Sequence, residues 1–360
     1  MFQGCVRHAG ERPMSEQPIV RSDRKFCRSL ILLLLIASSI AVSSIAVNPA
    51  EYDFSAFRRF ITFFLSMLVQ SFPFLLAGTV VSSALHFFVP EHALQQLMGR
   101  SSFTAIPAAI VASMAFPVCD CASVPVASRL MRKGVRVSAV VTYMRASPIL
   151  NPVVIASTIF AFPDRPGLCT GRIVLGLLIP VSIGLILGKL FTRESATRRR
   201  FTPAGSEECG CHHDIKSSTT PQKLAAMLVH AGDEFVAVSP YIIAGAAVSS
   251  LVQVAVPREA LAVTSVSSRF LIHPLVMICA AFLLSVCSTS DAFIARGFSS
   301  AFSGGSVLAF MTAGPMIDVK NILMMLPYFR KRFIIALALL VCLMTYLSAV
   351  AASFLFFGVY

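Results

Sequence analysis

The stretch FPVCDCASVPVASRLMRKGVRVSAVVTYMRASPILNPVVIASTIF, residues 116–160, places polar and helix-breaking residues within an otherwise apolar sequence. It contains Cys119, Asp120 and Cys121 in a row, four prolines, and Arg145 further along. Polar groups and irregular backbone are costly at membrane depth, where they are tolerated when they are buried in protein or line a cavity. The stretch therefore predicts a transport pathway built from broken helices.

The composition of the chain indicates a membrane protein. Of its 360 residues, 56% are hydrophobic and 13% are charged, against about 25% charged residues in a soluble domain. The net charge of +13 is concentrated at helix ends and in connecting loops without interleaved aromatic residues, which favours positive-inside bias over nucleic-acid binding. We therefore expect an all-α, polytopic helical protein of the inner membrane, whose partners are the lipid bilayer and a small-molecule solute.

Polar segments divide the chain into five parts. We expect a basic cytoplasmic tail (1–28), a first transmembrane helix (29–47), a first permease repeat (57–191), a polar linker (192–222) and a second permease repeat (223–358). The alternative for the second part is a cleaved signal peptide, because a basic segment precedes it.

The two halves of the chain resemble each other. Residues 71–90 match residues 238–257 at eight of twenty aligned positions, and the same offset aligns Asn151 with Asp318. The basic loops fall on one side of the membrane only if the second copy starts from the side opposite to the first. The sequence therefore predicts two inverted-topology repeats with broken or re-entrant helices, and a site near the midplane where the breaks meet.

Several motifs resemble those of the ArsP-type permeases, including the YraQ/YcgR-like predicted permeases. They are Pro117-Val-Cys119-x-Cys121-x-x-x-Pro125, Arg132-Lys133-Gly134, Ala146-Ser147-Pro148-x-x-Asn151-Pro152, Cys287-Ser-Thr-Ser-Asp291 and Gly314-Pro315-Met-Ile-Asp318-x-Lys320-Asn321. The resemblance covers residues 57–358 and implies a secondary permease; characterised ArsP-type members export trivalent organoarsenicals such as methylarsenite. This chain has Cys-Asp-Cys-Ala where Cys-Ser-Cys-Gly is usual, and the added carboxylate suits a cation or a proton as well as a metalloid.

The candidate substrate-binding residues are the cysteines, polar residues and helix breakers of the apolar core. They are Cys119, Asp120, Cys121, Arg145, Ser147, Pro148, Asn151, Cys287, Asp291, Asp318 and Asn321. Thiolates bind soft metals, and trivalent arsenic shares that preference; the alternative is that the cysteines are small residues at a tight helix crossing. We expect Arg145 to pair with Asp120 or Asp318, and Arg296 and Lys320 to lie at the membrane interface.

The polar linker contains a second group of possible ligands. Cys209, Cys211, His212 and His213 offer four nitrogen or sulfur donors within five residues, which is a composition that zinc favours. The alternative is an incidental polar loop.

The sequence favours a secondary permease that exports trivalent (organo)arsenicals or a related small soft solute, driven by proton exchange at a buried carboxylate. The alternative is a membrane-embedded thiol redox or metal-handling protein that uses Cys119, Cys121 and the linker loop. We expect no cofactor and no enzymatic activity, because no nucleophile–base arrangement and no phosphate-binding glycine loop is recognisable.

Overall fold

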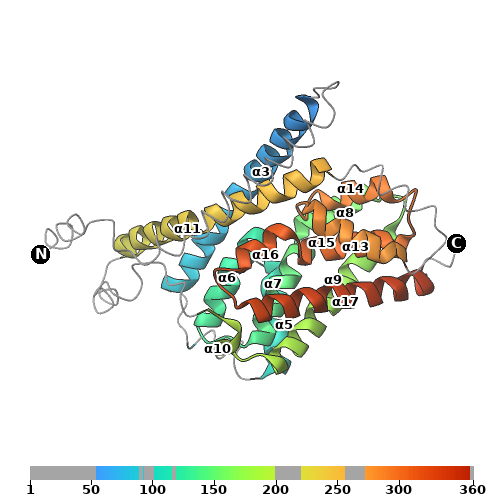
Figure 1. Cartoon of the computed structure of the whole chain (residues 1–360). Coiled ribbons are helices and arrows are strands. Elements are labelled where there is room, and N and C mark those ends of the chain that lie inside the picture. Colours follow the sequence, from blue (N-terminus) through green and yellow to red (C-terminus); the bar gives the residue numbers. More distant parts are fainter. Residues whose placement is uncertain are drawn as a thin grey trace, which may run out of the picture. The chain divides into compact units, whose positions relative to one another are not determined.

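The computed structural model describes residues 54–88, 92, 101–115, 119–198, 220–255 and 272–356 (Figure 1). From Arg58 onward these residues belong to one compact unit, and their regular structure is helical apart from a bridge between Thr197 and Phe329. The expected tail (1–28) and first transmembrane helix (29–47) lie outside the described residues. So do Cys209, Cys211, His212 and His213 of the linker.

The described helices follow the same order in the two halves of the chain. The first half contains α3 (Phe54–Phe88), α5 (Ser102–Ala115), α6 (Asp120–Arg132), α7 (Val137–Leu150), α8 (Pro152–Ala161) and α9 (Pro166–Leu190), followed by the short α10 (Arg193–Ala196). The second half contains α11 (Thr220–Ala255), α13 (Ile272–Leu284), α14 (Asp291–Phe298), α15 (Gly304–Met316), α16 (Val319–Met325) and α17 (Lys331–Phe356).

Six helical segments among the described residues are long and apolar enough to cross a membrane, so the expected all-helical, multi-pass class is confirmed. These segments are Ala56–Leu85, Val137–Ala161, Pro166–Leu190, Leu224–Ala255, Gly304–Met325 and Lys331–Phe354. Two of them are broken: α7 continues into α8, and α15 continues into α16.

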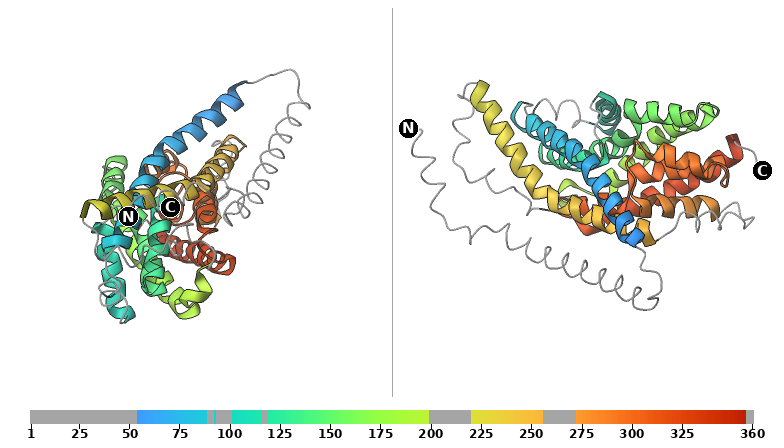
Figure 2. Two further views of the ribbon diagram at one scale, coloured as in Figure 1. Left: turned by 90° about the vertical axis from the view of Figure 1, so that its left-hand side faces the viewer. Right: turned by 90° about the horizontal axis from the view of Figure 1, so that it is seen from above.

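Two helices form the centre of the fold. Every residue of α7 and every residue of α15 is buried. Helix α7 packs against α5 and α9, helix α15 packs against α13 and α17, and the two central helices contact each other. The surrounding helices expose large apolar side chains such as Leu178, Val236 and Leu339, as expected for surfaces that face lipid. In Figure 2, α3 and α11 cross each other beside these helices.

Small residues allow the central helices to approach their neighbours closely. A Cβ atom added to Gly184 of α9 would lie 2.2 Å from Thr142 Oγ1, and one added to Gly176 would lie 2.4 Å from Ile149 Cγ2. Helices in membranes associate through such close backbone contacts because lipid supplies no hydrophobic driving force between them.

The two broken helices end at polar residues. Asn151 has an extended backbone and ends α7, after which Pro152 begins α8. Ile317 and Asp318 are likewise extended and separate α15 from α16. The sequence predicts broken helices within residues 116–160, and the structure locates one break at Asn151, whereas Ser147 and Pro148 remain within α7.

Candidate substrate site

The first part of the site is the beginning of α6. Cys119 precedes the helix with an extended backbone (φ −71°, ψ 172°), and Asp120 is the first helical residue, where the helix dipole stabilises a negative charge. The change from extended to helical backbone turns three neighbouring side chains toward one point. Ligand atoms of Cys119, Asp120 and Cys121 all lie within 4.8 Å of one another, and all three residues are buried.

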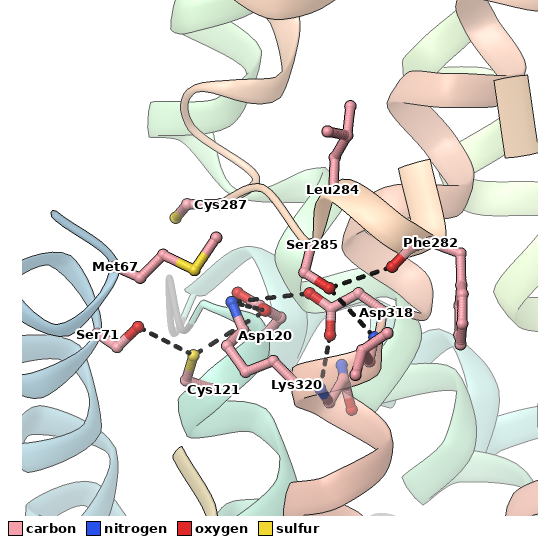
Figure 3. Close-up of polar contacts among 12 residues, drawn as sticks. Met67, Ser71, Asp120, Cys121, Phe282, Leu284, Ser285, Cys287, Asp318 and Lys320 are labelled. Atoms are coloured by element: carbon pink, nitrogen blue, oxygen red, sulfur yellow. Dashed lines mark hydrogen bonds and ion pairs between the residues drawn. The ribbon is translucent and has the colours of Figure 1, made fainter. Parts of the chain in front are cut away.

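Lys320 of α16 contacts this group from the second half of the chain (Figure 3). Its Nζ lies 3.1 Å from Asp120 Oδ2 and 3.7 Å from Asp318 Oδ2. The lysine side chain is only 4% exposed, so the prediction of an interfacial Lys320 is wrong. The residue lies one position inside α16, and this short half-helix brings it into the protein interior.

Additional sulfur and hydroxyl groups surround the Asp120–Lys320 pair. The Cys121 thiol lies 3.9 Å from Ser71 Oγ and 4.0 Å from Asp120 Oδ2. Cys287 interacts electrostatically with Asp120 and Lys320, and the side chain of Met67 points from α3 toward this group (Figure 3). We define the central cluster as Cys119, Asp120, Cys121, Cys287, Asp318 and Lys320.

Ser285 connects the end of α13 to the beginning of α16. Its hydroxyl donates a hydrogen bond to the carbonyl of Phe282 (3.1 Å) and accepts one from the backbone N–H of Val319 (3.2 Å). Its φ of 47° lies in the left-handed region, which is costly for a residue with a Cβ. Such strain persists where the surroundings determine it, and it is frequent at functional sites.

Three oxygen acceptors at the central cluster or next to it have no hydrogen-bond partner. They are Asp120 Oδ1, Asp318 Oδ2 and Asn321 Oδ1, and each is buried. Asp318 Oδ2 still faces Lys320 at ion-pair distance. Most buried polar atoms in proteins are satisfied, so these oxygens are available to a ligand that enters the cluster.

Arg145 does not form the ion pairs that the sequence suggested. Its guanidinium donates to the Met316 carbonyl and, at 2.9 Å, to Met325 Sδ, while Nε has no partner. Among the described residues, the ion pairs of Asp120 and Asp318 are made by Lys320 instead. Arg145 remains close enough to interact electrostatically with both carboxylates. It is therefore a buried cation held by uncharged acceptors.

The carboxylate of Asp291 has an ion-pair partner of its own, Arg172, although the backbone N–H of Asp291 donates to the carbonyl of Cys287. Arg172 of α9 donates to both carboxylate oxygens, at 2.9 and 2.6 Å, and also to Thr158 Oγ1 of α8. Both charged side chains are 2% exposed. The carboxylate of Asp291 is thus fully engaged, and it ties α14 to the first half of the chain.

A second, exposed ion pair joins the same parts of the chain. Arg296 of α14 lies 2.8 Å from Asp164 in the loop between α8 and α9, and both side chains are solvent-accessible. The hydrogen bond from Arg296 holds the pKa of Asp164 below its ordinary value. Arg296 therefore lies at an exposed surface, where it has a carboxylate partner.

Some residues in or near the central cluster and the Arg172–Asp291 pair were not identified from the sequence. They are Met67, Arg172, Ser285 and, as a member of the site, Lys320. Arg172 carried a recognisable signal, because an arginine inside an apolar span requires a partner or a cavity. Lys320 lies two residues after Asp318, so the predicted break inside a membrane span indicated an interior position for it. Met67 and Ser285 carried no local signal.

Broken helices that meet at buried charged residues within a bundle of membrane-spanning helices are typical of secondary transporters. The fold and the site thus define a multi-pass membrane transport protein. The chain belongs to the ArsP_1 family, described as predicted permeases, whose family model matches residues 56–354.

Two relatives cover most of this chain. It is 38% identical over 283 residues to the UPF0718 protein YcgR of Bacillus subtilis, an alignment that covers 79% of this chain and 93% of the relative. It is 30% identical over 282 residues to a putative two-component membrane permease complex subunit of Streptococcus mutans, covering 78% of this chain and 90% of the relative. No solved structure matches the chain.

Proposed function

We propose that this permease exports a small thiophilic solute, such as a trivalent organoarsenical, through the central cluster. The observation that carries the proposal is the buried group of Cys119, Asp120 and Cys121, whose ligand atoms lie within 4.8 Å of one another. Sulfur donors favour soft metals, and trivalent arsenic has the same preference. Each thiol that replaces a hydroxyl group on arsenic forms an S–As bond, and its proton leaves with the hydroxide as water.

The buried carboxylates give this permease a possible coupling group. Asp120 and Asp318 are buried at the proposed solute site, and each has one oxygen without a hydrogen-bond partner. Proton exchange at one of these two residues would drive export without a nucleotide-binding domain.

We further propose that the two halves are inverted repeats. Helices α7 (Val137) and α15 (Gly304) begin 167 positions apart, and so do α8 (Pro152) and α16 (Val319). The same offset aligns residues 71–90 with residues 238–257. Contacts across the halves are reciprocal, because α6 packs on α16 while α14 packs on α8. Alternating access then moves one half against the other around the central cluster.

Side-chain contacts between α3 and α11 support the same arrangement. Met67 Sδ accepts a hydrogen bond from Ser250 at 3.8 Å, and Glu234, which aligns with Met67, accepts one from Ser82 at 3.1 Å. Ser82 aligns with Ser249, the neighbour of Ser250. This nearly reciprocal pair of contacts is expected if a two-fold axis relates the halves.

The proximity of the thiols also favours a second candidate, a thiol redox protein. Cys119 and Cys121 could join in a disulfide while a partner disulfide is reduced to two thiols, and the linker loop would then deliver metal or electrons. The Streptococcus mutans relative is named as a subunit of a putative two-component membrane permease complex, and we propose that this chain likewise assembles with a second component.

The experiment compares accumulation of methylarsenite in an arsenical-sensitive bacterial host. The strains express the wild type, the double variant Cys119→Ser/Cys121→Ser, or a variant with residues 209–213 replaced by glycine and serine. Cys279→Ser is the matched control, because this thiol is exposed and does not belong to the central cluster. We expect the wild type, the control and the loop variant to lower methylarsenite accumulation below that of cells without the permease. The double variant should not lower it.

Two results would reject this function. Unchanged accumulation with well-inserted wild type would exclude organoarsenical export. Full export by the double variant would exclude Cys119 and Cys121 as ligands of the solute. Oxidation of Cys119 and Cys121 without any flux would favour the redox candidate.

A further inference from the structure

The central cluster has the composition of a site for a divalent metal ion. Two thiols and a carboxylate lie within 4.8 Å of one another in the protein interior, and zinc and similar ions combine such ligands. Composition alone therefore does not explain why the site would select an uncharged thiophile over a free metal ion.

Lys320 occupies the position beside the carboxylate that such a cation would need. Its ammonium lies 3.1 Å from Asp120 Oδ2, the oxygen that is 4.0 Å from the Cys121 sulfur. Its stem is fixed by α11, because Gly245 approaches the backbone of Lys320 so closely that an added Cβ would lie 2.9 Å from its Cα. The lysine is thus packed against α11 at its backbone and contacts Asp120 through its ammonium.

The charges around the cluster are already balanced. Asp120 and Asp318 are compensated by Lys320, which contacts both, and by Arg145, which interacts with both at longer range. All four residues are buried. A divalent cation added to this neutral set would be repelled by an ammonium a few ångströms away, with little solvent to screen it.

We propose that Lys320 is a specificity-determining residue that excludes divalent metal ions from the group formed by Cys119, Asp120 and Cys121. An uncharged solute that exchanges hydroxyl groups for thiols adds no charge, so Lys320 does not oppose its binding. The inference rests on the proposed function for the identity of the solute, but the exclusion of cations is measured independently of transport.

The test measures cadmium binding to the purified full chain in lipid nanodiscs. Cd²⁺ is the probe, and the cadmium–thiolate charge-transfer absorption is the readout. Lys320→Met removes the charge and keeps an unbranched side chain, whereas Lys320→Arg keeps the charge as a matched control. We expect Lys320→Met to bind Cd²⁺ at least about tenfold more tightly than the wild type and Lys320→Arg. The increase in Cd²⁺ affinity should disappear in the double variant Lys320→Met/Cys121→Ser.

A second measurement uses the unaltered chain and does not depend on the folding of a variant. The neutral trivalent arsenical phenylarsine oxide and Cd²⁺ are compared for protection of Cys121 against a small methanethiosulfonate reagent, read by mass spectrometry. We expect protection by the arsenical and none by Cd²⁺ at the same concentration.

Two outcomes would overturn the role of Lys320. One is Cd²⁺ protection of wild-type Cys121 equal to that of the arsenical. The other is a folded Lys320→Met variant that binds Cd²⁺ no more tightly than the wild type. If the arsenical fails to protect Cys121 while Lys320→Met still gains Cys121-dependent cadmium binding, the proposed solute is rejected and the role of Lys320 is supported.

Discussion

Asn151 and Asp318 each cap a half-helix, α8 and α16 respectively, although only Asp318 is charged. Asp318 lies 167 residues after Asn151. Asn151 Oδ1 accepts the N–H of Val153 at 2.9 Å, and Asp318 Oδ1 accepts the N–H of Asn321 at 2.5 Å. Because an N-cap requires only an acceptor oxygen, the charge of Asp318 is free to serve another purpose, the interaction with Lys320.

Substitutions of Asp318 should separate these two roles. Asp318→Asn and Asp318→Ala both remove the charge, but only asparagine preserves the cap. We expect Asp318→Ala to be less stable than Asp318→Asn by about 1 kcal/mol, the usual contribution of an N-cap. Thermal unfolding in detergent, followed by circular dichroism, measures the difference. Asn151→Ala should show a similar loss relative to the wild type, and equal stabilities in either comparison would contradict the capping roles.

The buried pair of Arg172 and Asp291 should be strongly sensitive to the loss of one partner. Asp291→Ala leaves the guanidinium of Arg172 in the interior without a carboxylate, which typically costs about 3–5 kcal/mol. The double variant Arg172→Met/Asp291→Leu removes both charges and should recover much of that loss. Denaturant titration of the detergent-solubilised protein measures all three stabilities.

The exposed pair of Arg296 and Asp164 is the natural control for this prediction. It also joins α14 to the first half of the chain, but its side chains are 42% and 57% exposed. Solvent screens such a pair, so Arg296→Ala and Asp164→Ala should change stability little. If Asp291→Ala were as mild as these variants, Asp291 would be free to bind solute, as the sequence interpretation suggested.

The elements of this fold that depend on local chemistry could be predicted from the sequence. Prolines and a polar residue mark the break before α8, and the second break follows from the alignment of Asn151 with Asp318. Apolar length alone predicts the spanning helices. Each of these features is set by residues that are adjacent along the chain.

The pairing of the buried charges could not be predicted in the same way. Arg145 is a plausible partner for Asp120 or Asp318, but its guanidinium donates to Met316 and Met325 instead. Which cation reaches a carboxylate depends on how α6, α11 and α16 pack, and these helices are far apart in the sequence. The sequence identified the buried charged residues, and tertiary packing determined which of them form ion pairs.

Ser285 provides a test of strain next to the central cluster. Its φ of 47° favours glycine, while its hydroxyl accepts the hydrogen bond of Val319 N–H. Ser285→Gly loses the hydrogen bond but relieves the backbone, whereas Ser285→Ala loses the hydrogen bond and keeps the strain. We therefore expect the alanine variant to be less stable than the glycine variant by roughly 1–2 kcal/mol, the cost of the left-handed conformation.

The same thermal unfolding assay compares the two variants of Ser285. A glycine variant that is no more stable than the alanine variant would show that the left-handed backbone carries no strain at this position. Ser239 is the control position, because it lies inside α11 and its partly buried hydroxyl donates to the backbone carbonyl of Phe235. It should show no advantage of glycine over alanine.

The close approach of α11 to Lys320 leads to a final prediction about Gly245. A methyl group at this position would lie 2.9 Å from Lys320 Cα and 3.2 Å from its Cβ, and backbone atoms cannot move aside as a flexible side chain can. Gly245→Ala should therefore push α16 away from α11 and displace the Lys320 ammonium from Asp120. We expect lower stability, reduced methylarsenite export and tighter Cd²⁺ binding than in the wild type.

Gly232 is the matched control on the same helix. A Cβ added there meets no atom within 4 Å, and alanine favours the helix by roughly 1 kcal/mol over glycine. Gly232→Ala should thus be at least as stable as the wild type and export methylarsenite normally. If Gly245→Ala behaved like Gly232→Ala in unfolding, export and cadmium binding, the contact between α11 and α16 would not be what positions Lys320. The lysine would then be held by its two carboxylate partners alone.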